Sequence, residues 1–528
     1  MNKKYYYIMG AALLLSLSGC EDFLTHDHPT SVTDEVWWNT EADATAALAS
    51  VYVGIPHGAT GRQVQFLSAL SDDAVARQST RGDYEAYVKG LQGPSFDKSL
   101  HIWQDNYKTI RRAARFLDHV DKVYMDESLK ARYKYEARAL RAYYHLELLM
   151  LFGGVPIVTS AVTPNESALP RNTKEEVYEF VVSELTAAAN NLPAEYSFND
   201  RTRITSGICW ALISRLALFH HKYDDARMAA RKIIDSNLYE LYESVDKKNS
   251  YADLFTYTGE LNKERIFYRE SGSSGAWNTF APKGIGGETV VSPTAAIVNS
   301  FETKQGKTIW ELGPDSAAIY QRDPTYKNNR DPRLAASVLL PGQEYDTNVL
   351  DPFNSDPKNA DRIGDQYSTA TGFWINKYLD PKDRNGSRTL DYMIIRYAEV
   401  LLNYVEALVE EGEWNHPDVL KYLNAIRNRA GMPDVDVAAY NSQEKMRELV
   451  RRERQVELAF EAVRYFDIRR WGIFEAVMNG PVYGAVHPET EQAILVEQRT
   501  ARANRDYYWP IPQNEIMANP NMEQNPNY

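Results

Sequence analysis

Hydrophobic residues recur with helical spacing in two long, separate blocks of the 528-residue chain, residues 34–236 and 394–477. Spacings of three and four residues place apolar side chains on one face of an α-helix. The intervening residues 240–393 are instead rich in Gly, Pro, Ser, Asn and Asp, with short β-prone pieces such as "RIFYRE" and "ASVLL", and residues 478–528 are also irregular. The sequence therefore predicts a mainly α fold with a long loop-rich insertion that contains short strands.

One pair of predicted helices has a repeat signature. In the segment "WALISRLALFHHKYDDARMAARKII", residues 210–234, the spacing of small residues is close to that of a tetratricopeptide repeat, with the second helix expected to begin at the turn formed by Tyr223 and Asp224. Looser helix pairs fit residues 101–151, 127–190 and 396–430. Stacked pairs of this kind form a scaffold in which each pair supports its neighbours.

The segment "RRERQVELAFEAVRYFDIRRWG", residues 451–472, contains six arginines in a chain whose formal net charge is -13. On one helix, an apolar face would be formed by Leu449, Val456, Phe460, Val463 and Phe466. Opposite-charge pairs at three- or four-residue spacing would be Glu448 with Arg452, Glu461 with Arg464, and Asp467 with Arg470. A nucleic-acid stripe would leave its arginines unpaired. The pattern favours a solvated or inter-helix ion-pair surface that stabilises the fold.

The N-terminus has the pattern of a secretory signal. Two lysines precede the short apolar run "IMGAALLLSLSG", and residues 17–20, Leu-Ser-Gly-Cys, resemble the bacterial lipobox. We expect residues 1–19 to be removed and Cys20 to be lipidated, because a diacyl anchor supplies the two chains that stable membrane attachment needs. The alternative is a plain secretory signal in which the cysteine is incidental.

Charge and cysteine content exclude several function classes. The chain has 59 basic and 72 acidic residues, which disfavours nucleic acid as a partner. Beyond Cys20 only Cys209 remains, so no intramolecular disulfide is expected, and its apolar surroundings "GICWALISRLAL" favour a buried core residue over a nucleophile. No later segment reaches the roughly 18 apolar residues of a transmembrane helix.

Motifs for catalysis or cofactor binding are missing from the sequence. There is no HExxH, GxSxG, P-loop or CxxC pattern. The segment "DPKDRNGSRTLDY" resembles a calcium loop through Asp383, Asn385 and Gly386, but Pro381 and Tyr392 occupy two ligand positions, so a turn is the better interpretation. We expect no cofactor and no enzyme activity, although a glycosidase carboxylate pair remains an open alternative.

Several segments, in this order, resemble the SusD/RagB-like outer-membrane lipoproteins of Bacteroidetes-type bacteria. They include "CEDFL", "DEVWWNTEADATAALASVYVG", "EARALRAYYHLELLMLFGGVPIV", "VSPTAAIVNSFE", "RDPRLAASVLLPG", "IIRYAEVLLNYVEAL", the arginine-rich segment and the terminal "YWPIPQNEIMANPN". The resemblance implies one domain over residues 20–528, with a helical part (20–239), a ligand-binding loop-rich region (240–393) and a C-terminal helical part and tail (394–528).

The same resemblance implies a function. Such proteins are lipid-anchored at the outer face of the outer membrane, where they sit over a SusC-like TonB-dependent transporter. They bind a glycan, or in some members a peptide, before import, and have no catalytic activity of their own.

A glycan site needs exposed aromatic rings, because sugar rings present apolar C–H faces. The chain has 35 Tyr and 10 Trp. Trp277 and Phe280 lie in the Gly/Ser-rich "SGSSGAWNTFAPKGIGG", where no helical phase assigns them to a core. The resemblance places other contacts in the loop "DDAVARQSTRGDYEAYVKGLQGPSFD", which offers Arg81, Asp83, Tyr84 and Tyr87.

Four further aromatic residues of the loop-rich region are candidates: Trp310, Tyr320, Tyr345 and Tyr367. For every candidate the alternative is a ring that only covers the scaffold. Trp374, in "TGFWINKY", alternates with polar residues and leads into framework sequence, so we interpret it as structural. Which glycan is bound, or whether the ligand is a peptide, depends on the geometry of these loops.

Overall fold

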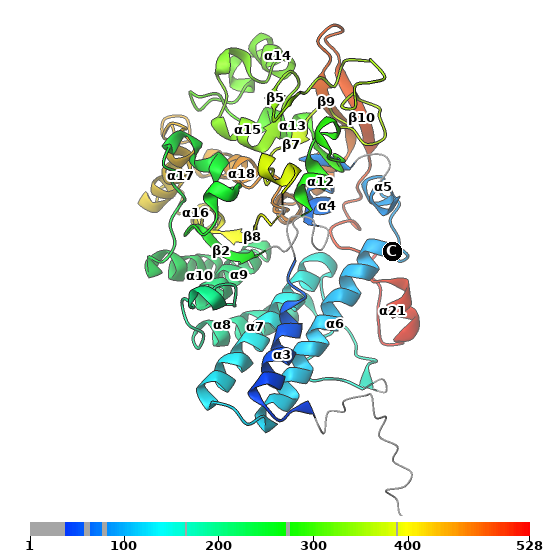
Figure 1. Cartoon of the computed structure of the whole chain (residues 1–528), viewed down its shortest axis with the longest axis vertical. Coiled ribbons are helices and arrows are strands. Elements are labelled where there is room, and N and C mark those ends of the chain that lie inside the picture. The colour runs from blue at the N-terminus through cyan, green and yellow to red at the C-terminus, as the bar shows by residue number, and fades with distance from the viewer. Residues whose placement is uncertain (1–36, 57–63, 77–81, 164–165, 271–274, 387–388) are drawn as a thin grey trace, which may run out of the picture.

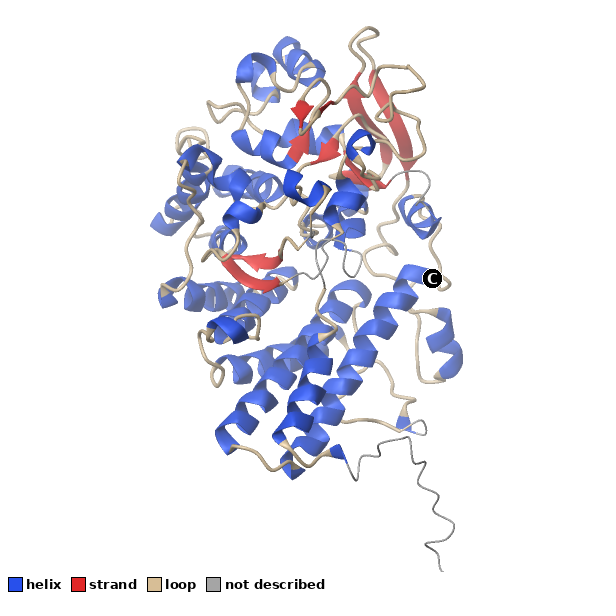
Figure 2. Ribbon diagram, in the orientation of Figure 1, coloured by secondary structure: helices blue, strands red, loops and turns tan. Residues whose placement is uncertain are grey.

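The computed structural model describes residues 37–56, 64–76, 82–163, 166–270, 275–386 and 389–528. It confirms the predicted mainly α fold (Figures 1 and 2). The N-terminal part contains α3 (Glu41–Tyr52), α4 (Val64–Ala69), β1 (Ala74–Ala76), α5 (Gly82–Val88), α6 (Asp97–His119), α7 (Glu127–Phe152), α8 (Lys174–Ala189), α9 (Ser206–Phe219) and α10 (Tyr223–Ser236).

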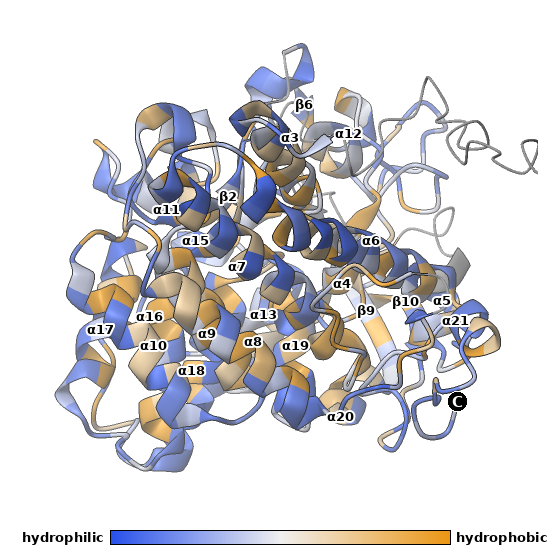
Figure 3. Cartoon of the chain, turned by 90° about the horizontal axis from the view of Figure 1, so that it is seen from below, coloured by the Kyte–Doolittle hydropathy of each residue, from blue (hydrophilic) through white to orange (hydrophobic). Residues whose placement is uncertain are grey.

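Consecutive long helices pack against each other from α6 through α10, and α10 packs on α16 (Tyr397–Glu410). Helix α16 then contacts both α17 (Pro417–Arg429) and α18 (Gln443–Glu457). The predicted helix pairs are therefore present, and Figure 3 shows hydrophobic residues of α9, α10 and α16 side by side. Two helical blocks that are distant in sequence thus form one continuous stack.

The helix pair α9 and α10 follows the predicted repeat. Thr205 caps α9 by accepting a hydrogen bond from the Ile208 amide (3.2 Å), and α10 begins at Tyr223, as expected. Cys209 is fully buried in this pair, which confirms its assignment to the core. Burial raises the pKa of the Cys209 thiol well above its usual value, so the thiol stays protonated and unreactive.

The loop-rich region contains short helices as well as the predicted short strands. Its elements are α11 (Ser250–Asp253), β2 (Arg265–Arg269), α12 (Ala276–Phe280), β3 (Val291–Pro293), α13 (Ala295–Ser300), α14 (Pro314–Arg322), α15 (Pro332–Ser337), β4 (Val338–Leu339), β5 (Glu344–Tyr345), β6 (Asn348–Val349), β7 (Trp374–Ile375) and β8 (Tyr392–Arg396). The strands form two-stranded antiparallel sheets, and β2 pairs with β8 directly before α16. This pairing brings the two ends of the loop-rich region together.

Helices α19 (Arg464–Arg470) and α20 (Phe474–Met478) end the predicted helical block. Residues 478–528 are more regular than predicted, because they contain β9 (Gly480–Val486), β10 (Ala493–Arg499) and α21 (Gln513–Ala518). Strands β9 and β10 form an antiparallel hairpin at the end of the molecule opposite α3 (Figure 1). One hydrophobic cluster includes residues from Val51 to Met522, so all three parts of the chain contribute to a common core.

The arginine-rich segment is two helices and not one. Helix α18 ends at Glu457, and the chain passes through left-handed backbone conformations at Phe460 (φ 61°) and Ala462 (φ 63°) before α19 begins. The single apolar face predicted through Leu449 and Phe466 is therefore wrong. Helical periodicity carries no signal for two non-glycine residues in this unusual conformation.

The segment's arginines are mostly inside the protein, so of the two alternatives the solvated surface is wrong. Of the three predicted pairs, only Arg470 with Asp467 forms (2.8 Å). Arg452 pairs with Glu302 (2.7 Å) and Arg464 with Asp72 (2.7 Å), both far away in the sequence. Ion pairs between helices do form, because Arg454 of α18 and Arg470 of α19 both pair with Glu406 of α16 (3.2 and 2.6 Å). Short-range spacing does not identify these partners.

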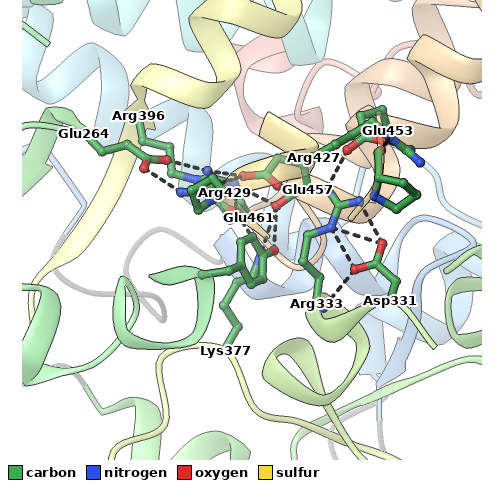
Figure 4. A network of polar contacts seen from close by, with 12 residues as sticks. Glu264, Asp331, Arg333, Lys377, Arg396, Arg427, Arg429, Glu453, Glu457 and Glu461 are labelled. Carbon is green, nitrogen blue, oxygen red and sulfur yellow. Dashed lines mark hydrogen bonds and ion pairs between the residues drawn. The ribbon is translucent and has the colours of Figure 1, made fainter. Parts of the chain in front are cut away.

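A buried ion network joins the loop-rich region to α18 (Figure 4). Arg333 of α15 pairs with Asp331 (2.8 Å), Glu453 (2.5 Å) and Glu457 (3.0 Å). Arg396 of β8 pairs with Glu264, Glu457 and Glu461 at 2.7, 2.7 and 2.8 Å. Buried charges are tolerated only when they are paired and hydrogen-bonded, which these side chains are.

Two groups show how the network is balanced. Burial opposes ionisation of Glu457, but Arg429, Arg396 and Arg333 outweigh it and hold the pKa of Glu457 well below its usual value. Lys377 is fully buried, and this burial lowers its pKa to about 8 despite its ion pair with Glu461 (2.8 Å). At neutral pH the network therefore consists of charged partners that stabilise one another.

Within the described ranges, no helix is both long and apolar enough to span a membrane. The calcium-loop segment forms a short 3-10 turn over Pro381–Arg384, and Asp383 accepts a hydrogen bond from the hydroxyl of Tyr257. No group of three His, Cys, Asp or Glu side chains among the described residues is arranged to hold a metal ion. The segment therefore forms a turn, as the sequence analysis interpreted it.

Candidate functional site

The structure brings three of the predicted aromatic residues into one group of loops, which we call the loop cluster: Trp277, Lys283, Tyr345, Asn348, Asp361, Asp365 and Tyr367. At its base, Trp277 of α12 stacks against Tyr345 of β5, with ring centroids 6.4 Å apart and an interplanar angle of 26°. Trp277 is only 1% exposed, whereas Tyr345 is half-buried. Trp277 therefore packs beneath Tyr345 inside the protein, and its indole ring is not available for stacking with a ligand.

The outer part of the loop cluster is a tyrosine ring held between charged groups. Lys283 lies in the turn Lys283–Ile285, with its Nζ 5.1 Å from the ring centroid of Tyr367 and 2.7 Å from Asp365 Oδ1. The hydrogen bond from Lys283 holds the pKa of the Asp365 carboxyl below its usual value. Tyr367 keeps 37% of its surface exposed. The cluster thus offers an aromatic edge beside a fixed cation and a fixed carboxylate.

A second carboxylate ties the loops of the cluster together. Asp361 accepts hydrogen bonds from the Gly284 amide (2.9 Å) and from Asn348 Nδ2 (2.6 Å). A Cβ at position 284 would lie 2.5 Å from Asp361 Oδ2 and 2.6 Å from Asn348 Nδ2, so a larger residue would displace these two side-chain ends. Glycine permits the close approach without such a displacement. Three loops that are separate in sequence are fixed relative to each other.

Trp310 is a separate exposed aromatic residue. It begins the short turn Trp310–Leu312 and is 58% exposed, while the preceding Ile309 is fully buried with Ala317 and Tyr320. Exposed tryptophans are unusual, because a large indole ring in water forgoes much of its hydrophobic stabilisation. Trp310 and Tyr367 are the predicted site residues that present the most ring surface.

Five predicted site residues are buried, and the prediction that they offer stacking faces is corrected: Trp277, Phe280, Tyr84, Tyr87 and Tyr320, each at most 6% exposed. Tyr84 accepts a hydrogen bond from Arg499 (3.0 Å), and Tyr87 shares one with Tyr465 (2.6 Å). These partners come from the C-terminal part of the chain. A Gly/Ser-rich or polar local sequence does not reveal that a distant segment covers a ring.

The remaining predictions have mixed outcomes. Trp374 is fully buried in β7, which confirms its structural role. Arg81 and Cys20 lie outside the described residues, as does the whole predicted signal segment, and for Asp83 only the backbone in α5 is described. The sequence analysis missed Lys283 and Asp365, for which no local motif gives a signal. It also missed Tyr483, although the alternation in "GPVYGAV" is typical of a strand with one exposed face.

The chain is a helical-repeat scaffold whose loop cluster presents aromatic and charged side chains. Two family models together match most of the chain, one described as the SusD family over residues 254–528 and the other as "Starch-binding associating with outer membrane" over residues 22–218. The protein belongs to the SusD family.

Similar proteins agree with this assignment over nearly the full length. SusD-like protein P38 of Formosa agariphila is 24% identical over 97% of this chain and 96% of its own. A SusD-like carbohydrate binding protein from Bacteroides fragilis is 28% identical, with a TM-score of 0.81 over 92% of this chain and 100% of its own. Another SusD-like protein from that species is 26% identical, with a TM-score of 0.80 over 94% and 99%.

Proposed function

We propose that this protein is a cell-surface lipoprotein that captures an oligosaccharide or polysaccharide and delivers it to a partner TonB-dependent transporter in the outer membrane. The observation that carries the proposal is the exposed Tyr367 ring, fixed beside Lys283 and Asp365, in a chain that belongs to the SusD family. A sugar ring can stack its C–H face on the phenol while its hydroxyls bond to the ammonium and carboxylate groups.

Binding without cleavage fits the groups in the loop cluster. Its two carboxylates are already engaged, Asp365 with Lys283 and Asp361 with the Gly284 amide and Asn348. Catalysis of glycoside hydrolysis needs one carboxyl group with a raised pKa and a second one free to act as base or nucleophile. Here the pKa of Asp365 is lowered, which suits a fixed hydrogen-bond acceptor.

The membrane part of the proposal rests on the sequence. The Leu-Ser-Gly-Cys pattern ending at Cys20 supports a diacyl anchor, and the description of the family model matched by residues 22–218 supports association with the outer membrane. We expect the wild-type protein to incorporate labelled palmitate in cells and the Cys20→Ala variant to incorporate none. Equal labelling of the two proteins would overturn the anchor.

Glycan binding is tested with an affinity-gel and calorimetry screen of host and plant polysaccharides. We expect Tyr367→Ala and Trp310→Ala each to weaken binding tenfold or more, about 1.4 kcal/mol. Tyr124→Ala is the matched control, because Tyr124 is 92% exposed but lies at the turn after α6, at the other end of the molecule. Release of reducing sugar would overturn the proposal that the protein binds without cleaving. Binding of peptides alone would overturn the proposal that the ligand is a glycan.

A further inference from the structure

Two adjoining hollows lie beside the hairpin β9–β10, and one of them is bordered by Val349, the residue after Asn348 of the loop cluster. Their volumes are about 440 and 420 Å³, and Gln321, Phe373 and Val486 border both of them. They share this border, and we call the two hollows together the hairpin trough. We propose that the hairpin trough is a second saccharide-binding site that takes an uncharged oligosaccharide, an inference that rests on the proposed glycan-binding function.

A tyrosine on the hairpin supplies the stacking surface. Tyr483 lines the trough, keeps 44% of its surface exposed, and stands opposite Leu495, which is 62% exposed, in the pairing of β9 with β10. Among the described residues the Tyr483 hydroxyl has no hydrogen-bond partner. An exposed ring with a free hydroxyl at its tip can contact both the apolar face and the hydroxyl groups of a sugar.

Two unengaged amides stand beside this ring. Asn299 near the end of α13 and Gln321 near the end of α14 both line the trough and are half-buried. Neither side chain forms a hydrogen bond or ion pair within the part of the chain that the structure describes. A carboxamide offers two donor hydrogens and an acceptor oxygen, which matches adjacent sugar hydroxyls. Both half-buried amides therefore keep hydrogen-bonding capacity for a ligand in the trough.

The position of Gln321 is set by its neighbours on α14. The adjacent Tyr320 is 6% exposed and accepts a hydrogen bond from Asn329 Nδ2 (2.9 Å). On the other side, Arg322 forms an ion pair with Glu491 in the loop of the hairpin. Helix α14 is thus held on both the core side and the hairpin side, so the Gln321 backbone is fixed before a ligand arrives.

The charges around the trough favour an uncharged ligand. Its only described cationic lining residues are Arg322 and Arg499, and both are engaged. Arg322 pairs with Glu491, while Arg499, only 2% exposed, pairs with Glu497 (2.7 Å) and donates to backbone carbonyl groups. Acidic side chains at Asp323 and Asp351 border the same space. A uronate or sulfate group would find no free cation here and would face repulsion.

The trough and the loop cluster are close enough for one long ligand to contact both. Tyr367 and Phe373 are six residues apart, so their Cα atoms are separated by at most about 22 Å. The connection is fixed, because Thr369 Oγ1 donates to the Phe373 carbonyl (2.7 Å) and accepts from the Gly372 amide (3.0 Å). Linked contacts of this kind raise overall affinity without new interactions at either site.

The test uses calorimetry of the purified protein with uncharged hexasaccharides of glucose and xylose, the corresponding polysaccharides, and hexagalacturonate as the anionic probe. Variants are Tyr483→Ala and Gln321→Ala, with Tyr367→Ala reporting on the loop cluster and Tyr124→Ala as the control. Unchanged circular dichroism and thermal midpoints show that each variant is folded. We expect at least a tenfold loss of affinity for an uncharged glycan in Tyr483→Ala and Gln321→Ala, and no binding of hexagalacturonate.

The outcomes separate the two proposals. If Tyr367→Ala weakens binding while both trough variants keep wild-type affinity, the hairpin trough is overturned and the proposed function stands. Binding of hexagalacturonate that depends on Tyr483 would overturn the uncharged ligand class. If the wild-type protein binds no probe at all, both the trough and the glycan-binding function are overturned.

Discussion

Replacing Arg333 by methionine tests whether the buried ion network holds the loop-rich region on the C-terminal helices. The Arg333 side chain is 1% exposed and pairs with Asp331 at 2.8 Å, Glu453 at 2.5 Å and Glu457 at 3.0 Å. Methionine is long and flexible, so Arg333→Met removes the charge while filling part of the same space. The change therefore isolates the electrostatic role of the side chain.

The expected loss follows from what each carboxylate retains. Glu453 keeps Arg427 (3.0 Å), and Glu457 keeps Arg396 (2.7 Å) and Arg429. Asp331, which is 2% exposed, loses its only ion-pair partner within the described residues. An uncompensated buried charge destabilises a fold by about 3–5 kcal/mol, so Arg333→Met should lower the free energy of unfolding by that amount at pH 7.

The loss should shrink in acid. Burial opposes ionisation of Glu453, but Arg333 and Arg427 outweigh it and keep its folded-state pKa below the ordinary value. A carboxyl with a lowered folded pKa stabilises the fold above its unfolded pKa, and this stabilisation disappears as the pH falls through the folded pKa. In Arg333→Met the folded pKa of Glu453 rises, so the free energies of unfolding of wild type and variant should converge as the pH falls below the ordinary glutamate pKa of about 4.

The assay is guanidinium unfolding followed by tryptophan fluorescence and circular dichroism. Arg322→Met is the control, because Arg322 and its partner Glu491 are 42% and 65% exposed and such pairs contribute about 1 kcal/mol or less. Adding Asp331→Asn to Arg333→Met should restore part of the stability by neutralising the stranded carboxylate. The reasoning is refuted if Arg333→Met is no less stable than Arg322→Met, or if the double variant recovers nothing.

Two further predictions concern buried titratable groups. Burial and the neighbouring Asp72 carboxylate raise the pKa of Asp73 to about 7, above its unfolded value of about 4, so wild-type stability should fall as the pH rises from about 4 to 7. Asp73→Asn should remove this slope and raise the melting temperature at pH 8 relative to wild type; parallel pH profiles for the two proteins would contradict it. Cys209 should react with a thiol reagent only after unfolding, because burial raises the pKa of its thiol. Rapid labelling of the native protein would contradict this, since it would show that the reagent reaches the Cys209 thiol in α9.

The sequence predicts local features of the fold well, because they depend on nearby residues. The start of α10 at Tyr223 follows from the spacing of small residues, and the burial of Cys209 follows from its apolar neighbours. Trp374 was assigned to the framework from strand alternation and is fully buried in β7. In each case the determining interactions lie within one or two elements, so periodicity and composition contain enough information.

The site depends on contacts that sequence spacing does not encode. Tyr84 is 1% exposed because Arg499 and Glu497, more than 400 residues away, contact its hydroxyl group. Arg464 was assigned to Glu461 by helical spacing, yet it pairs with Asp72 because two left-handed residues separate α18 from α19. A polar loop sequence therefore predicts that a ring lies in a loop, but its exposure is decided by segments that pack from elsewhere.

The position of the buried network gives a physical reason for keeping so many charges inside the protein. Its members Asp331, Arg333 and Lys377 belong to the same loop-rich region that carries the loop cluster and one wall of the hairpin trough. Ordering a flexible loop when a ligand binds lowers affinity, since each immobilised side chain loses conformational entropy. Directional ion pairs to α18 fix this region before binding, which an apolar contact of the same area would do with less geometric definition. On this argument Arg333→Met should weaken glycan binding as well as folding, at pH values where the variant is still folded.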